Sequence, residues 1–221
     1  MHPAIADHPA SLRERVAMLV RADILSGRSG PGTMYTVPSL AAELAISTTP
    51  VREALLDLAG NGFLAPVRNR GFRVEGMTRA DLDHLFELRE LLERHALVTL
   101  AERGLGDAAA LSVLADAVAA AVEAEDGRGY LEADRNFHQA LVERAGNPLL
   151  TKLVMDLRDR MRLYGFDTPA GRRRQQASVS EHYRLIELAA AGDTQGIATL
   201  ITLHIMEWKQ VFADAMPERR L

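Results

Sequence analysis

Apolar residues recur at helical spacing through most of the chain after Met77. One run is Leu82, Leu85, Phe86, Leu88, Leu92, Leu97 and Leu100, and another is Leu111, Leu114, Val118 and Val122. This spacing places apolar side chains on one face of a helix. Segments rich in glycine, aspartate or proline separate the runs, and no convincing strand pattern appears among them. The pattern therefore predicts an antiparallel, all-helical bundle of about six helices over residues 77–221.

Residues 1–76 contain shorter predicted elements, which are separated by more glycine, proline and other turn-forming residues. Apolar positions predict a helix over 12–25, a short helix starting at Pro38 or Ser39, and a third starting near Thr49-Pro50. The buried face of the third is expected to be Val51, Ala54, Leu55 and Leu58. Thr49 is expected to cap its free amides, with Pro50 in its first turn. Two short strands, 63–67 and 71–74, are predicted to form a hairpin.

This order of elements predicts a mainly α fold in which a winged helix-turn-helix domain, residues 1–76, precedes the bundle at 77–221. In that motif the second helix enters the DNA major groove, where hydroxyl residues, backbone amides and a cation meet bases and phosphates. The candidate DNA-binding residues are Ser47, Thr48, Thr49 and Arg52 at the helix start and Arg68, Arg70 and Arg73 in or beside the hairpin. The alternative is an ordinary small α+β domain with solvated arginines.

Charge and composition change this picture in part. The 221 residues include 26 Lys+Arg and 30 Asp+Glu, and a net charge of −4 by itself disfavours nucleic-acid binding. A cut after Gly76 leaves 8 basic and 7 acidic residues before it (+1), and 18 and 23 after it (−5). The acidic excess thus belongs to the predicted bundle. The chain has no cysteine, which excludes a disulfide scaffold, a thiolate zinc site and a cysteine nucleophile.

No apolar stretch reaches the roughly 18 residues that a membrane span needs. The first residues also lack the basic-then-apolar pattern of a signal peptide. We therefore expect a cytoplasmic protein with no membrane partner.

Four residues of the predicted bundle are candidate metal ligands. Asp134 and His138 are four positions apart, so a helix places both on one face. His182 is expected early in a later helix, and His204 lies on the last long helix. Three helices could aim these groups at one point, and the donor set suits zinc, nickel, iron or manganese. The alternatives are core histidines bonded to backbone carbonyls, a polar residue near a helix end at His182, and a surface charge at Asp134.

A basic segment, Arg172, Arg173 and Arg174, is the remaining charged feature. It could contact DNA phosphate, but an exposed basic loop is the preferred interpretation.

The motifs of the first domain resemble those of a known family. Thr49-Pro50 precedes Val51-Arg-Glu-Ala-Leu55, Pro31-Gly32 lies upstream, and Gly62-Phe63 and Arg70-Gly-Phe-Arg-Val74 lie downstream. In this order they resemble GntR-type transcription regulators, and the FadR-like branch with an all-helical (FCD-type) effector domain fits best. The resemblance extends from about Leu12 to about Ile205.

One position departs from the family pattern. The recognition helix of the family usually opens Ser-Arg-Thr-Pro-Val-Arg, whereas this chain has Thr48 in place of the first arginine. That arginine often contacts guanine in the family. Such a contact contributes ~1–3 kcal/mol of discrimination, which threonine cannot reproduce. We therefore expect an operator that differs from the usual one.

The resemblance also bears on the bundle. Metal-binding members of this branch carry Asp-x-x-x-His, then Glu-His, then a late histidine, which correspond here to Asp134, His138, His182 and His204. Zinc is the ion expected first, with nickel, iron or manganese as alternatives. Acyl-CoA-responsive members lack this set, so a small organic acid is the expected effector. Arg89 lies where the family often has an arginine on the first effector-domain helix. It is the candidate effector-binding residue, unless it is simply the i,i+4 partner of Glu93 on a solvated face.

Together these features predict a ligand-responsive transcription regulator with no catalytic residues. A homodimer would read double-stranded operator DNA with two-fold-related half-sites, and the effector would modulate its affinity. Two alternatives stay open. One is a metal-dependent, hydrolase-like enzyme that uses an open Asp/His₃ site. The other is a regulator that senses the metal ion itself.

Overall fold

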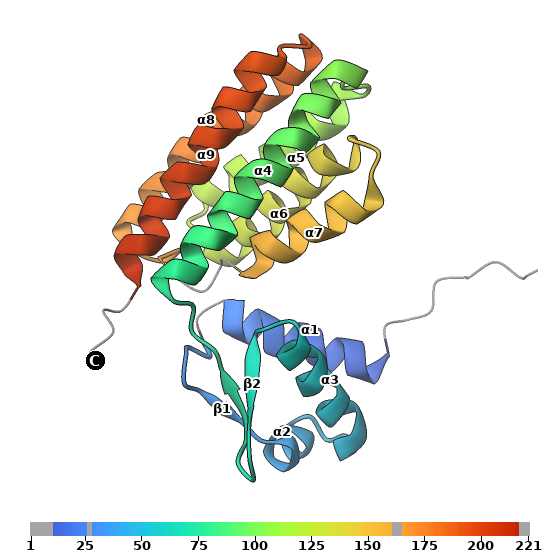
Figure 1. Cartoon of the computed structure of the whole chain (residues 1–221), viewed down its shortest axis with the longest axis vertical. Coiled ribbons are helices and arrows are strands. Elements are labelled where there is room, and N and C mark those ends of the chain that lie inside the picture. The colour runs from blue at the N-terminus through green and yellow to red at the C-terminus, as the bar shows by residue number, and fades with distance from the viewer. Residues whose placement is uncertain (1–10, 26–27, 161–164, 217–221) are drawn as a thin grey trace, which may run out of the picture. The chain divides into compact units, whose positions relative to one another are not determined.

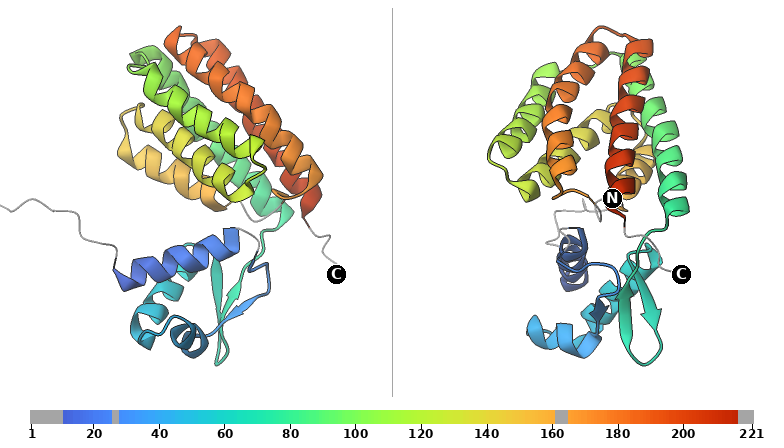
Figure 2. Two further views of the ribbon diagram at one scale, coloured as in Figure 1. Left: turned by 180° about the vertical axis from the view of Figure 1, so that it is seen from behind. Right: turned by 90° about the vertical axis from the view of Figure 1, so that its left-hand side faces the viewer.

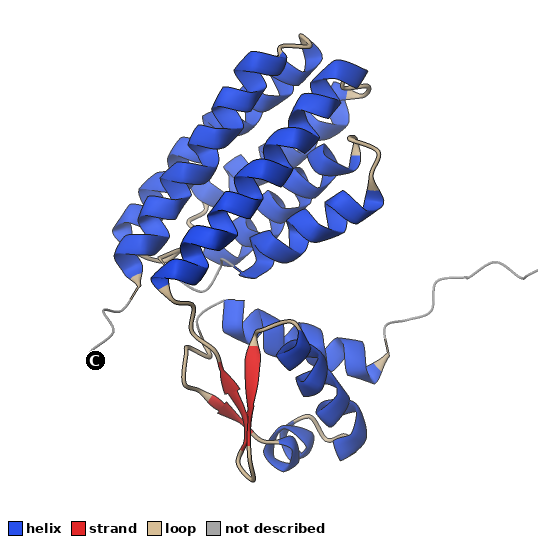
Figure 3. Ribbon diagram, viewed as in Figure 1, coloured by secondary structure: helices blue, strands red, loops and turns tan. Residues whose placement is uncertain are grey.

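The computed structural model describes residues 11–25, 28–160 and 165–216 and divides into two compact units, Met1–Met77 and Thr78–Leu221 (Figure 1). We call them the winged unit and the helical unit. The predicted fold class is confirmed, because helices dominate both units and the strands lie in the winged unit alone among the described residues (Figure 3). None of the described helices is long and apolar enough to cross a membrane.

The winged unit contains three helices and a small antiparallel sheet within its described part. Its elements are α1 (Leu12–Leu25), β1 (Met34–Tyr35), α2 (Val37–Glu43), α3 (Thr48–Gly60), β2 (Leu64–Val67) and β3 (Gly71–Val74). The strands lie in the order β1-β3-β2, so β2 and β3 form the predicted hairpin and β1 adds an edge that the sequence did not reveal. Two residues are too few to show strand alternation.

Local chemistry accounts for the borders of these elements. Helix α2 begins at Val37 because Thr36 Oγ1 accepts a hydrogen bond from the amide of Ser39 at 3.2 Å. Helix α3 begins at Thr48 with Ser47 as its N-cap residue, so the predicted cap at Thr49 is wrong. Gly71 starts β3 with φ +116°, and a Cβ there would lie 2.2 Å from the carbonyl oxygen of Tyr35. The close approach of β1 to β3 therefore requires glycine.

Burial in α3 follows the predicted face, since Val51, Ala54, Leu55 and Leu58 are its buried side chains. Helix α1 contributes Val16, Val20 and Ile24 to the same core, and the sheet contributes Phe72 and Val74. The apolar face of α3 is thus fully used by packing. Thr48, Thr49 and Arg52 at its start are exposed, as are residues 68–70 of the hairpin turn.

The helical unit contains the expected six helices in its described part. They are α4 (Arg79–Arg103), α5 (Ala108–Glu123), α6 (Gly127–Glu143), α7 (Pro148–Arg160), α8 (Pro169–Ala190) and α9 (Thr194–Ala215). Helix α9 packs against α4 on one side and α8 on the other, and α5 packs against α6 and α8 (Figure 2). The side chains of Thr78, Asp107, Asp126 and Asp193 cap the starts of α4, α5, α6 and α9.

Helix α8 corrects two predictions. It begins at Pro169, where Thr168 Oγ1 accepts a hydrogen bond from the amide of Gly171 at 3.0 Å. The segment 172–174 is therefore helical, and Arg174 is buried, so the predicted exposed basic loop is wrong. His182 consequently lies well inside the helix rather than near its start.

A close backbone contact fixes the first turn of α8. A Cβ at Gly171 would lie 2.1 Å from the carbonyl oxygen of Gly165 and 2.4 Å from that of Phe166. The side chain of Gln175 donates a hydrogen bond to Phe166 O at 2.9 Å. Phe166 is thereby held against α8, which places its ring beside the buried site described next.

Candidate metal centre

The structure brings together the four residues singled out as metal ligands. Asp134 and His138 extend from α6, His182 from α8 and His204 from α9. Each offers one ligand atom, and these atoms all lie within 4.8 Å of one another. Asp134 Oδ1 is 3.6 Å from His138 Nε2 and 3.5 Å from His182 Nε2. All three imidazoles are fully buried, so the cluster lies in the interior of the bundle.

The histidine nitrogens have an unusual environment. Both ring nitrogens of His138, both of His182 and Nε2 of His204 are buried without a hydrogen-bond partner among the described residues. Leaving such a group unsatisfied costs about 1–3 kcal/mol. The alternative interpretation was that core histidines bond to backbone carbonyls, and these five ring nitrogens make no such bond to the described residues. Three imidazoles and a carboxylate within ligand distance of one point fit a divalent ion.

Electrostatics keep the imidazoles neutral. Burial lowers the pKa of His182 to about 4. Burial also lowers the pKa of His138 and of His204 well below the usual value. The charge of Arg158 lowers both pKa values further, and that of Arg174 lowers the pKa of His204. Neutral imidazole is the form that binds a metal. The folded protein thus presents these ligands ready for an ion.

Asp134 is also half of a buried ion-pair network. Arg158 donates from Nη2 to Asp134 Oδ2 at 3.1 Å and from Nη1 to Glu93 Oε2 at 2.6 Å. Burial alone raises the pKa of Asp134, but His138 and Arg158 more than offset this and hold the pKa well below its usual value. The carboxylate therefore stays ionised, as a ligand must, and the surface-charge interpretation of Asp134 is wrong.

Arg89 belongs to the same network. It donates from Nε to Glu93 Oε1 at 2.6 Å, which is the expected i,i+4 pair. The pair is buried, with Arg89 4% and Glu93 0% exposed, so the expected solvated face is wrong. Burial lowers the pKa of Arg89, whereas the charge of Glu93 opposes this effect. Two arginines and two carboxylates give the network no net formal charge.

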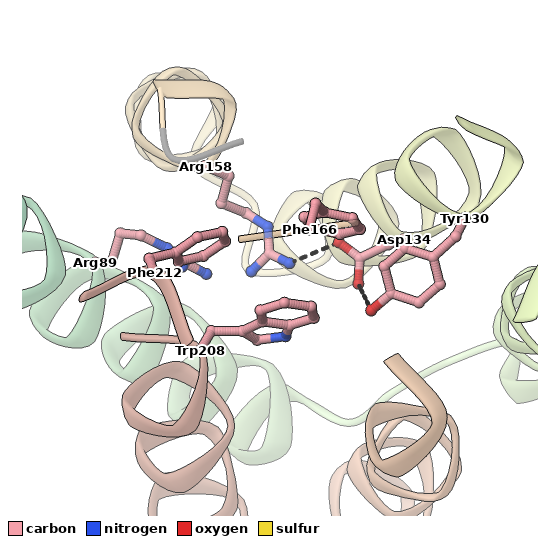
Figure 4. Close-up of a pocket in the computed structure, with 7 residues that line it drawn as sticks. All are labelled: Arg89, Tyr130, Asp134, Arg158, Phe166, Trp208 and Phe212. Atoms are coloured by element: carbon pink, nitrogen blue, oxygen red, sulfur yellow. Dashed lines mark hydrogen bonds and ion pairs between the residues drawn. The ribbon is translucent and has the colours of Figure 1, made fainter. Parts of the chain in front are cut away.

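A small cavity of about 30 Å³ lies beside this network (Figure 4). Its lining residues are Arg89, Tyr130, Asp134, Arg158, Phe166, Trp208 and Phe212. The rings of Trp208, Phe166 and Phe212 form a three-ring cluster, in which Trp208 stacks on Phe166 at a centroid distance of 5.0 Å and on Phe212 at 5.4 Å, and the two phenyl rings are 6.4 Å apart. Volume of this size holds a water molecule or two. The cavity thus joins a proposed ligand of the ion, Asp134, to two guanidinium groups and an aromatic wall.

Several residues of the site gave no signal in the sequence. Glu93, Arg158, Arg174 and Glu181 all bond to a candidate ligand or to its partner. The available hints were the i,i+4 spacing of Arg89 and Glu93 and the Glu-His pair of the family motif, which here is Glu181 and His182. Charged residues at other positions of amphipathic helices are ordinarily solvated, and so sequence reasoning passed over them.

The candidate DNA-binding residues are all exposed on the winged unit. Ser47, Thr48, Thr49 and Arg52 lie at the start of α3, Arg68 and Arg70 in the turn between β2 and β3, and Arg73 on β3. Arg52, Arg68 and Arg70 have no carboxylate partner among the described residues. Arg73 donates from Nη2 to Glu75 Oε1 at 2.9 Å. The first three thus present uncompensated positive charge, while that of Arg73 is partly offset.

Comparison with known proteins bears on both units. Residues 84–207 match the family model described as "FCD domain", and residues 12–74 match "Bacterial regulatory proteins, gntR family". The chain belongs to the GntR family. It combines the family's winged helix-turn-helix domain with an FCD domain, as the resemblance implied, and it is a DNA-binding transcription regulator.

Individual relatives agree with this assignment. The GntR-family chain is 32% identical over 179 residues to the Nta operon transcriptional regulator of Aminobacter aminovorans, which covers 80% of this chain and 83% of that protein. It is 30% identical over 177 residues to the HTH-type transcriptional regulator McbR of Escherichia coli (strain K12), and this alignment covers 77% of this chain and 78% of that protein. The solved structure of E. coli McbR/YncC superposes with a TM-score of 0.78 at 26% identity, and the superposition covers 90% of this chain and 95% of that one. These relatives and the fold are those of regulators and not of enzymes, which sets the hydrolase alternative aside.

Proposed function

We propose that the helical unit of this GntR-family regulator binds a divalent metal ion, zinc in the first instance, through Asp134, His138, His182 and His204. A small carboxylate effector binds beside the ion and changes the affinity of the winged unit for operator DNA. The observation that carries this proposal is the set of buried ring nitrogens without hydrogen-bond partners, which face one ionised carboxylate.

The charge of the site supports an anionic effector. The network of Arg89, Arg158, Glu93 and Asp134 is neutral by formal charge, so a divalent ion adds two positive charges to a site shielded from water. Uncompensated charge is costly in such a place. Four protein ligands leave one or two positions of a five- or six-coordinate ion for a carboxylate oxygen. Arg158 and Arg89 line the adjoining cavity and would donate to the carboxylate, and an acid larger than the one or two water molecules that this cavity holds would have to displace part of its aromatic wall.

The winged unit would bind DNA as expected for a helix-turn-helix protein. The exposed start of α3 would enter the major groove, with Ser47, Thr48, Thr49 and Arg52 toward bases and phosphates. Arg68 and Arg70 in the hairpin turn, and Arg73 beside it, would follow the backbone or enter the minor groove. A homodimer would place two such units on the two half-sites of an operator with two-fold symmetry.

The experiment has two stages. Thermal shift on zinc-loaded protein with a panel of small mono- and dicarboxylates identifies compounds that bind the native state, because such binding raises apparent stability. Fluorescence anisotropy then measures affinity for a duplex selected from random sequences, with and without the compound. Coupling of ~1–3 kcal/mol, roughly 5- to 150-fold in affinity, is expected. If no acid changes the affinity and zinc removal alone does, the protein senses the metal ion itself.

A further inference from the structure

One of the three buried histidines differs from the other two in its contacts. His204 Nδ1 lies 2.6 Å from Glu181 Oε2, whereas both ring nitrogens of His138 and of His182 lack a hydrogen-bond partner in the described part of the chain. Arg174 Nη2 also lies 3.3 Å from this nitrogen, but the carboxylate oxygen is closer and only accepts hydrogen bonds, so Nδ1 carries the proton. The lone pair of His204 is then on Nε2, for which the residues that the structure describes provide no hydrogen-bond partner.

Glu181 is itself held in place by Arg174, which lies seven residues earlier on the same helix. The guanidinium donates from Nη1 to Glu181 Oε1 at 2.9 Å and also pairs through Nη2 with Oε2. Such two-point pairs fix the plane of a carboxylate as well as its position. Arg174 is 5% exposed and donates from Nη2 to the backbone carbonyl of His204 at 3.3 Å. The three side chains thus form one connected unit between α8 and α9.

We propose that Glu181 is the positioning residue of the metal centre. By accepting from Nδ1 it selects one tautomer of His204, holds the ring in a single orientation and leaves Nε2 as the ligand atom. Arg174 keeps the carboxylate in that place. The inference rests on the metal centre proposed above, and it adds a residue outside the four ligands on which metal affinity depends. Carboxylates that orient metal-bound histidines commonly have this effect.

The alternative is that Glu181 has only a structural role. It would then neutralise Arg174 and so join α8 to α9, with no consequence for the ring of His204. The chain offers a matched control, because Glu207 also pairs with Arg174, its Oε2 lying 3.4 Å from Nε. Glu207 has no bond to His204 among the described interactions. A variant at Glu207 therefore removes a carboxylate from Arg174 and leaves the histidine contact intact.

The experiment measures zinc affinity by competition with a chromophoric chelator, using the full chain. Glu181→Ala is expected to bind zinc roughly 10- to 100-fold more weakly than the unmodified protein. Glu181→Gln keeps an acceptor oxygen but not the charge, and an intermediate loss is expected. Glu207→Ala is expected to match the unmodified protein. Equal affinity in Glu181→Ala and the unmodified protein, or equal weakening in Glu207→Ala, would overturn the proposal.

A second readout separates this inference from the metal centre itself. Nitrogen-15 NMR of the histidine side chains in zinc-free protein reports which ring nitrogen carries the proton. The proton of His204 is expected on Nδ1 in the unmodified protein and in Glu207→Ala, fully redistributed in Glu181→Ala, and partly redistributed in Glu181→Gln, whose amide oxygen is a weaker acceptor than the carboxylate. The isosteric glutamine variant carries the comparison if Glu181→Ala fails to fold. Absence of zinc binding in the unmodified protein would defeat the metal centre, whereas an unchanged tautomer in the variants would defeat the positioning role.

Discussion

Arg158 binds one oxygen of Asp134, Oδ2, and leaves the other, Oδ1, facing two imidazoles. A single carboxylate therefore belongs both to an ion-pair network and to the proposed metal centre. The same guanidinium lines the cavity proposed for the effector. A ligand that draws Arg158 toward itself would weaken its bond to Asp134, which gives the effector a direct route to the ion.

The first prediction concerns Arg158 itself. Arg158→Met leaves Glu93 and Asp134 buried without this cation, and loss of one partner of a buried pair costs about 3–5 kcal/mol. Urea unfolding of the zinc-free protein measures the loss. Lys152→Met is the control, since Lys152 and Asp156 form a pair whose side chains are 70% and 46% exposed. It should cost less than ~1 kcal/mol, and similar losses in both variants would contradict the network described here.

The second prediction concerns the proposed metal ligands. His138→Ala and His204→Ala should each abolish stoichiometric zinc, measured by elemental analysis after dialysis, because each removes one of four ligands. His84→Ala and His95→Ala change exposed histidines of α4 and should leave the stoichiometry intact. Circular dichroism checks that every variant remains folded. Zinc retained by His138→Ala or His204→Ala would rule out the four-residue site.

The third prediction concerns pH in the zinc-free protein. Burial lowers the pKa of His182 from 6.5 to about 4, so the unfolded chain takes up a proton in this range and the folded chain does not. The free energy of unfolding should therefore fall as the pH is lowered from about 6.5 toward 4, by on the order of 3 kcal/mol from His182 alone. His138 and His204 act in the same direction. The lowered pKa of Asp134 has its effect below pH 3.8, outside this range.

Urea unfolding in the presence of a chelator at pH 7.5, 6 and 5 measures this dependence. His182→Gln removes one of the three titrating groups and should show a shallower fall. A zinc-free protein whose stability is constant from pH 7.5 to 5 would mean that the imidazoles are protonated equally in the folded and unfolded chains.

The fourth prediction concerns DNA. Arg52→Ala, Arg68→Ala and Arg70→Ala should each weaken binding to the selected duplex. Where the replaced arginine contacts a phosphate, the slope of log affinity against log salt concentration should also decrease in magnitude by about one. Arg73→Ala should have a smaller effect because Glu75 already offsets its charge. Arg28→Ala, which removes an exposed arginine paired with Asp23, is the control. An equal effect of Arg28→Ala would indicate net charge rather than contact.

The fifth prediction concerns Gly171. A methyl group there would meet two backbone carbonyls at 2.1 and 2.4 Å, so Gly171→Ala must displace α8 or the segment carrying Phe166. We expect the variant to be destabilised by ~1–3 kcal/mol, which is the usual cost of overpacking. We also expect it to bind the effector identified by thermal shift more weakly. Gly60→Ala has open space around the new methyl group and serves as the control. Unchanged melting of Gly171→Ala would contradict the close packing.

The elements could be predicted because each buries one continuous face. Helical periodicity is sufficient for α4 to α9 and for the face of α3 that carries Val51 and Leu55. The start of α8 was missed although its signal was present, since Thr168 followed by Pro169 is typical of a helix N-terminus. The interpretation of Arg172, Arg173 and Arg174 as a solvated loop did not take this signal into account.

The site could be predicted only where spacing along one helix reveals it. Asp134 and His138 share a face of α6, so their proximity follows from the sequence. Glu93 and Arg158 are 65 residues apart and meet because α4 packs against α7, which no local pattern contains. Residues that neutralise or orient a buried ligand are found through tertiary packing. The resemblance therefore supplied the four ligands, but it gave Glu181 only as the residue before His182, without a role, and it did not give Arg158.

The proposed ligands come from three helices, and the stretches of chain between them form long loops in the unfolded state. In a protein without cysteine, an ion held at this point would tie those loops together much as a disulfide does, but reversibly. Because an ion that binds the native chain shifts the folding equilibrium, the supply of metal would also set how often the helical unit opens to proteases. The amount of regulator in the cell would then follow the metal, alongside its affinity for DNA.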